Sequence, residues 1–263
     1  MNRNIKRSQK GFTLVELAIV LVIIGLIVSG VLVGQDLIKA AELRATTKQL
    51  QDFQVGVNTF IGKYSKIPGD IDGSKYGLGG TSDGTAGKGD ENGLITESGS
   101  ATAITDLDGE ITDFWAHLTA SGKELIQGVY DGDDGSTIGE DIPAMRFGSR
   151  GWGVYGVSGA NYFITGVIAS NTYSTADTFV PIDAFNIDSK IDDGVPSSGN
   201  VQVVDGQTAG TPNLQDLSGG TATFATGATG TATACVATTP APDAYQFTAT
   251  TALCNMRFKM QTF

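Results

Sequence analysis

An unbroken apolar segment near the N-terminus constrains this chain more than any other feature. From Phe12 to Val33 the sequence reads FTLVELAIVLVIIGLIVSGVLV, about 22 residues in which Glu16 is the one charged side chain. An α-helix needs about 20 consecutive apolar residues to cross a bilayer. Residues 1–11 carry no acid but four basic side chains: Arg3, Lys6, Arg7 and Lys10. By the positive-inside rule, this basic flank stays cytoplasmic and the chain beyond Val33 emerges on the far side.

Two simpler interpretations compete for this segment. A secretory signal peptide has an apolar core of about 7 to 15 residues followed by a small-x-small cleavage site. The core here is longer, although Val28-Ser29-Gly30 imitates such a site. An uncleaved membrane anchor explains the length and the basic flank, but it does not explain Glu16, because a carboxylate inside a membrane helix is costly and is by default functional.

The residues around Glu16 resemble a known family. KGFTLVELAIVLVIIGLIVSG closely resembles the cleavage and methylation segment of type IV prepilins and type II secretion pseudopilins. The resemblance implies that a membrane-embedded prepilin peptidase cuts between Gly11 and Phe12 and then methylates the new amino group of Phe12. It also implies that Glu16 pairs with the terminal amine of a neighbouring subunit during assembly.

The segment after the membrane run is polar and carries a narrow apolar stripe. Its members recur at helical spacing: Leu43, Leu50, Phe53, Val57, Phe60 and Tyr64. The pattern predicts that one helix continues from Phe12 to Lys66, ends before Pro68-Gly69 and packs its stripe on a following sheet.

The rest of the chain predicts an α+β head with an antiparallel sheet. Glycine-rich turns alternate with a short helix over about 112–123, strands over 144–147, 153–157 and 161–169, a short helix within 185–201 that ends at a glycine turn, and a final strand over 254–258. The fold class is therefore a long N-terminal α-helix, membrane-spanning and then amphipathic, packed on a C-terminal pilin-like head. We expect a leader at 1–11 that is removed, an assembly helix at 12–33, its amphipathic continuation at 34–66 and the head at 67–263, with a Thr/Ala/Gly-rich region at 206–251.

Cysteine is used only twice, at Cys235 and Cys254, far beyond the membrane segment. In a part of the chain that lies outside the cytoplasm, these two favour a disulfide over two buried thiols.

Residues suited to catalysis are scarce. His117 is the one histidine, so neither a multi-histidine zinc site nor a Ser-His-Asp system is expected, and we predict no enzymatic activity. Calcium is a candidate ligand, because GDENGLI places Asp90 and Asn92 as in the middle of a calcium loop. Lys88 and Gly99 replace the first aspartate and the last glutamate of an EF-hand, which excludes that motif, and solvated acidic turns are the alternative.

These observations predict a structural subunit of a type IV pilus or a type II secretion pseudopilus. It is made as a single-pass bacterial inner-membrane precursor with a periplasmic head, and its partners are the prepilin peptidase, an inner-membrane assembly platform and related subunits in a helical filament. Beyond Ile67, acids outnumber bases three to one, so no nucleic acid partner is expected. The alternative is a membrane-anchored or secreted binding module that does not assemble.

Overall fold

The computed structural model describes residues 12–78, 89–96, 109–120, 124–132, 137–148, 150–157, 159–167, 178–205, 235–237, 244–250 and 254–261. The chain forms two compact units, Met1–Glu42 and Leu43–Phe263. The predicted leader, residues 1–11, and most of the Thr/Ala/Gly-rich region lie outside the described residues.

The first helix, α1, runs from Leu14 to Tyr64. In the second unit its inward side buries seven residues: Leu43, Thr46, Leu50, Phe53, Gly56, Val57 and Phe60. The predicted stripe is therefore confirmed, with Tyr64 partly buried against the same core. The helix ends at Tyr64, two residues before the predicted Lys66, because Ser65 takes a left-handed conformation (φ 55°) and donates its N–H to the carbonyl of Ile61 (2.7 Å).

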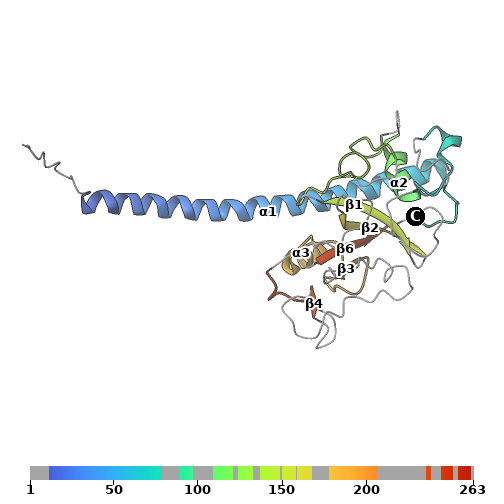
Figure 1. Ribbon diagram of the computed structural model, residues 1–263. Coiled ribbons are helices and arrows are strands. Elements are labelled where there is room, and N and C mark those ends of the chain that lie inside the picture. Colours follow the sequence, from blue (N-terminus) through green and yellow to red (C-terminus); the bar gives the residue numbers. More distant parts are fainter. Residues whose placement is uncertain are drawn as a thin grey trace, which may run out of the picture. The chain divides into compact units, whose positions relative to one another are not determined.

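A four-stranded antiparallel sheet forms the centre of the head (Figure 1). Its strands are β1 (Gly151–Val157), β2 (Ala160–Val167), β3 (Val201–Asp205) and β6 (Cys254–Lys259), in the order β1-β2-β6-β3. The predicted α+β class with an antiparallel sheet is confirmed. The strands predicted at 153–157, 161–169 and 254–258 correspond to β1, β2 and β6, and β3 was not anticipated.

The segment predicted as a strand over 144–147 is a turn, so that prediction is wrong. Ala144 makes one isolated bridge to Gly151, and the N–H of Met145 donates to the carbonyl of Arg150 (2.8 Å). Gly148, at φ 69°, reverses the chain between these residues. The turn delivers the chain directly into β1.

The two short helices of the head have different bounds from those predicted. Helix α2 spans Glu110–Thr119, beginning two residues before the predicted start, and Lys123 lies outside the described residues. Helix α3 spans Pro181–Ile191, because a proline at the first helical position favours an earlier start. The predicted glycine turn follows at Gly194, and the end of the predicted segment, Val201, belongs to β3. A single 3-10 turn, η1, covers Gly73–Tyr76.

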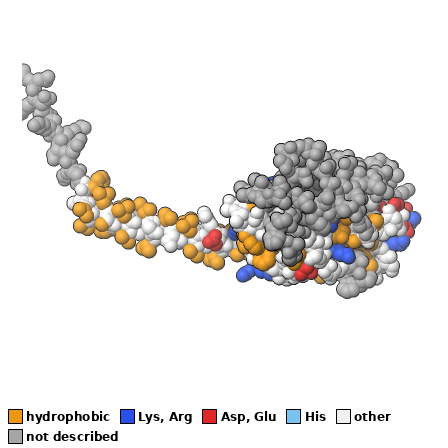
Figure 2. Space-filling model, turned by 90° about the horizontal axis from the view of Figure 1, so that it is seen from below, with side chains coloured by type: hydrophobic (Ala, Val, Ile, Leu, Met, Phe, Trp, Pro, Cys, Tyr) orange, Lys and Arg blue, Asp and Glu red, His pale blue; other side chains and the backbone are white. Residues whose placement is uncertain are grey.

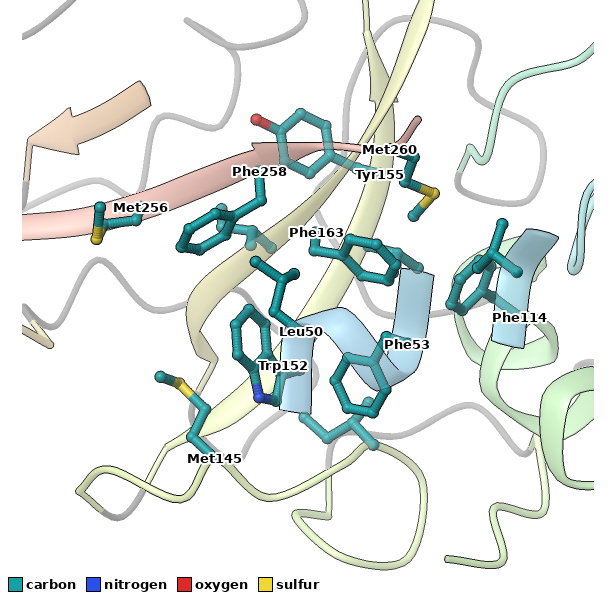
Figure 3. Close-up of a cluster of buried hydrophobic side chains, with 14 of the residues drawn as sticks. Leu50, Phe53, Phe114, Met145, Trp152, Tyr155, Phe163, Met256, Phe258 and Met260 are labelled. Atoms are coloured by element: carbon teal, nitrogen blue, oxygen red, sulfur yellow. The ribbon is translucent and has the colours of Figure 1, made fainter. Parts of the chain in front are cut away.

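The core lies where the helices meet one face of the sheet. Figure 3 shows Leu50 and Phe53 of α1 among Trp152, Phe163 and Phe258 from the sheet. The ring of Phe53 lies 5.0 Å from that of Trp115, 5.7 Å from Trp152 and 5.9 Å from Phe163 between ring centroids. Through these contacts Phe53 helps to join α1 to α2 and to the sheet.

A disulfide joins Cys235 to Cys254, as predicted. It ties the first residue of β6 to the segment before β4 (Val236–Ala237), which pairs with β5 (Ala244–Tyr245). The bridge therefore anchors the described end of the Thr/Ala/Gly-rich region to the sheet.

Candidate functional site

The N-terminal part of α1 presents its apolar side chains to the outside. Every residue from Phe12 to Val33 is exposed within the chain, including the bulky residues at every turn. Figure 2 shows these hydrophobic side chains along the helix. By length and composition, α1 is a helix that can cross a membrane. An apolar surface of this extent requires a bilayer or other protein chains to cover it.

Glu16 lies in the first turn of this helix and completes a capping box with Thr13. Both the N–H (2.7 Å) and the hydroxyl (2.9 Å) of Thr13 donate to one carboxylate oxygen of Glu16, and the N–H of Glu16 donates to the Thr13 hydroxyl oxygen (3.3 Å). In such a box two backbone N–H groups that lack helical partners are satisfied reciprocally. The carboxylate is thus held close to the start of the helix by Thr13, the residue after Phe12.

The predicted cleavage bond spans the edge of the described residues. Gly11 lies outside them, whereas Phe12 is 85% exposed and non-helical. The helix begins only at Leu14, so Phe12 lies outside the regular helix. The structure thus brings Phe12, Thr13 and Glu16 together at one end of α1.

A second candidate site lies in the head, where three segments distant in sequence converge. Asp70 follows the end of α1, Asp90 lies in the loop 89–96, and Glu110 opens α2. Each offers a carboxylate oxygen within 4.8 Å of the other two. Asp70 and Glu110 are buried and Asp90 is exposed.

Hydrogen bonds hold the loop 89–96 against the two buried acids. One oxygen of Glu110 accepts the N–H of Asp90 (2.9 Å), and the other accepts the N–H of Thr96 (2.8 Å). Asp70 Oδ2 accepts the N–H of Gly93 (2.7 Å). The predicted ligand Asn92 instead orients Asp90: its side-chain amide donates to Asp90 Oδ2 (2.7 Å).

Burial changes the titration of the two inner acids. Loss of solvent raises the pKa of Asp70 to about 6 and that of Glu110 to about 7, and the neighbouring carboxylates of the cluster act in the same direction. Asp70 and Glu110 therefore ionise less readily than exposed carboxyl groups do. The sequence pattern selected Asp90 but not Asp70 and Glu110, because these two acids come close to Asp90 only through long-range contacts.

A further acidic group, Asp188, Asp192 and Asp193, lies at the end of α3. Its oxygens are used within the fold. Asp188 accepts the hydroxyl of Tyr245 (2.7 Å), Asp192 Oδ2 accepts the N–H of Val201 (3.1 Å), and Asp193 accepts the Ser198 hydroxyl (2.7 Å). This group therefore shapes the turn between α3 and β3.

The single histidine is part of the core. His117 is completely buried, and its Nδ1 accepts the N–H of Gly69 (2.9 Å). The contact joins α2 to the turn after α1, which is a structural use of this side chain.

The comparisons with known proteins identify the N-terminal segment. Residues 6–32 match the family model of the prokaryotic N-terminal methylation motif. Searches of curated proteins and of solved structures found no significant match to the chain. The matched range includes the Gly11–Phe12 bond, Thr13 and Glu16. The chain therefore carries, at residues 6–32, the prepilin-type cleavage and methylation segment, which supports a type IV pilin-like or pseudopilin subunit.

Proposed function

We propose that this protein is a structural, non-catalytic subunit of a type IV pilus or a type II secretion pseudopilus. A prepilin peptidase hydrolyses the Gly11–Phe12 amide, and the new amine of Phe12 receives a methyl group from a methyl donor. The precursor spans the bacterial inner membrane once, with its N-terminus cytoplasmic and its head periplasmic. From there an assembly platform adds it to a helical filament of like or related subunits.

The observation that carries this proposal is the methylation motif placed on an exposed apolar helix with one charge. Glu16 is the sole ionisable side chain between Phe12 and Val33. Near the centre of a bilayer such a group costs on the order of 2.5 to 3.5 kcal/mol, and less towards an interface. A charged side chain that is unfavourable in a simple membrane anchor can be accommodated when another chain supplies the opposite charge.

The position of Glu16 suits it to act as such a partner. Its carboxylate lies at the start of α1, where the described contacts are those to Thr13 of the same chain. Cleavage creates a cation at Phe12, and in a filament the Phe12 of one subunit meets the Glu16 of the next. Because a buried charge left without its counterpart is strongly unfavourable, this pairing selects one register between subunits.

Substitution of Glu16 by glutamine tests the charge separately from the helix cap. Glutamine also completes a capping box, so Glu16→Gln keeps the start of the helix and removes only the negative charge. We expect Glu16→Gln to be cleaved normally and to be absent from filaments, as measured by immunoblotting of sheared filament and membrane fractions.

Thr13→Ala is the matched control. It keeps the charge but removes the Thr13 hydroxyl from the capping box, a change that costs about 1 kcal/mol of helix stability. We expect this variant to enter filaments. Normal assembly of Glu16→Gln, or equal loss of assembly in both variants, would contradict the role of the charge.

The alternative, an anchored binding module, draws on a pocket of the head. A cavity of about 470 Å³ is lined by Lys48, Gln49 and Asp52 of α1 and by Tyr130 and Arg146 from the facing loops. A binding module requires no cleavage after Gly11 and no filament. Retention of an uncut precursor in wild-type cells that contain the peptidase would favour this alternative.

A further inference from the structure

We propose that Asp70, Asp90 and Glu110 form a binding site for one Ca²⁺ ion in the head. The site lies where the turn after α1, the loop 89–96 and the start of α2 meet. The inference concerns the head alone and does not depend on cleavage or filament assembly, so it goes beyond the proposed function.

The first argument is an oxygen that lacks a partner. Asp70 is 2% exposed, and while its Oδ2 accepts the N–H of Gly93, no donor among the described residues bonds to its Oδ1. A buried polar atom without a partner is unfavourable and calls for an explanation. A cation bound between the three carboxylates would supply the missing partner.

The second argument is the charge of the cluster. When ionised, the three acids bring three negative charges together. The nearby ammonium groups are paired with other acids, Lys66 with Glu91 (2.7 Å) and Lys75 with Asp72 (3.4 Å). Lys66 also interacts electrostatically with Asp70 and offsets part of the charge. The rest of the charge of the cluster is left to be balanced by protons or by a bound cation.

The type and number of the ligands fit calcium best among common divalent ions. Carboxylate oxygens are hard ligands, which favours Ca²⁺ or Mg²⁺ over zinc. Ca²⁺ binds oxygen at 2.3–2.6 Å, so ligands across the ion lie up to roughly 4.6–5.2 Å apart. The three carboxylate oxygens are within 4.8 Å of one another. Mg²⁺ demands a near-ideal octahedron and is usually bound through one or two carboxylates and several waters, so a site of three carboxylates favours Ca²⁺.

The loop that supplies Asp90 is held in place by close backbone packing. A Cβ at Gly89 would lie 2.3 Å from the backbone of Asp70, so only glycine permits this approach. At the other end of the loop, Asn161 of β2 accepts the N–H of Ile95 (2.9 Å) and donates to the carbonyl of Gly93 (2.9 Å). The carboxylates are therefore preorganised by the fold, which reduces the cost of assembling them around an ion.

Calcium titration of the full chain in detergent tests the site. The protein is first treated with a chelator and then titrated with CaCl₂ in a calorimeter, with MgCl₂ in a parallel run. We expect one Ca²⁺ per chain with a dissociation constant on the order of 10⁻⁴ to 10⁻³ M, the range of extracellular calcium modules. We also expect a rise in the thermal unfolding midpoint with Ca²⁺.

Two variants locate the ion. Asp90→Asn removes an exposed ligand and should weaken Ca²⁺ binding about tenfold or more without lowering the unfolding midpoint of the calcium-free protein, and Asp70→Asn should do the same if it folds. Asp193→Asn, in the hydrogen-bonded acidic group after α3, is the matched control and should bind Ca²⁺ as the wild type does. The proposal is overturned if binding does not saturate by about 10 mM Ca²⁺, if Asp90→Asn leaves the affinity unchanged, if Asp193→Asn weakens binding as much as Asp90→Asn, or if Mg²⁺ binds as tightly.

Discussion

Replacing Phe53 by alanine is the most informative perturbation of the head. The Phe53 side chain is 3% exposed, and its ring meets three aromatic rings from α2 and the sheet. A buried Phe→Ala change costs about 3–5 kcal/mol through lost transfer free energy and the cavity left behind. Because the cavity would open at the junction of α1 with the rest of the core, we expect a value near the middle of that range, about 4 kcal/mol.

The two tryptophans of the chain report directly on this site. Trp115 and Trp152 both contact Phe53, so the fluorescence change on heating follows the same core. For a domain of 150–250 residues, about 4 kcal/mol corresponds to a fall of roughly 8–16 °C in the unfolding midpoint. The measurement uses the full chain in detergent.

Val55→Ala is the control on the same helix. Val55 is 65% exposed, and alanine is the better helix former, so the midpoint should change little. A loss below about 1 kcal/mol for Phe53→Ala, or a loss equal to that of the control, would mean that α1 does not pack on the sheet through this residue.

Three further predictions concern the head. Removing the Cys235–Cys254 bridge by serine substitution should cost about 3 kcal/mol of stability, measured by denaturant unfolding, since the bridge closes a loop with a sequence separation of 19; an unchanged midpoint would refute this. Burial raises the pKa of Asp188 to about 6, despite the hydrogen bond donated by Tyr245. Between about pH 4 and 6 the Asp188 carboxyl is protonated in the folded state and ionised in the unfolded state. This difference stabilises the folded state fully below about pH 4, and the stabilisation is lost as the pH rises through 6. The difference in stability between wild type and Asp188→Asn should therefore move by up to about 3 kcal/mol in favour of the variant between pH 4 and 7, and a constant difference would contradict it. Gly69→Ala should destabilise by at least about 2 kcal/mol in thermal unfolding, because Gly69 has φ 85° and a Cβ would lie 2.4 Å from a carbonyl oxygen of α2; a neutral effect would show that the turn can relax.

Local patterns predicted the features that depend on local spacing. The stripe from Leu43 to Phe60 was visible because buried residues on a helix recur every three or four positions. The final strand, Cys254–Phe258, was expected because the pair Cys235 and Cys254 ties down this end of the chain. The lone charge at Glu16 was visible against a uniformly apolar background.

Features that depend on long-range contacts were not predictable in this way. The strand β3 follows a glycine turn and was not predicted, since its identity comes from pairing with β6. The acidic cluster required knowledge that Asp70 and Glu110, 40 positions apart, meet across the loop 89–96. The capping box formed by Thr13 and Glu16 is an exception, because it depends only on the local motif TLVE. That motif was not recognised as a cap, since the same residues also fit an ordinary membrane helix.

The central claim, that the leader ends at Gly11 and that Phe12 begins the mature subunit, is tested most directly by mass spectrometry of the mature N-terminus. The protein is purified from cells that contain a prepilin peptidase, and its N-terminal peptide is fragmented. The account predicts a peptide that begins with N-methylated Phe12. A chain that retains Met1, or one that begins near Val31 after a signal-peptidase cut, would contradict it.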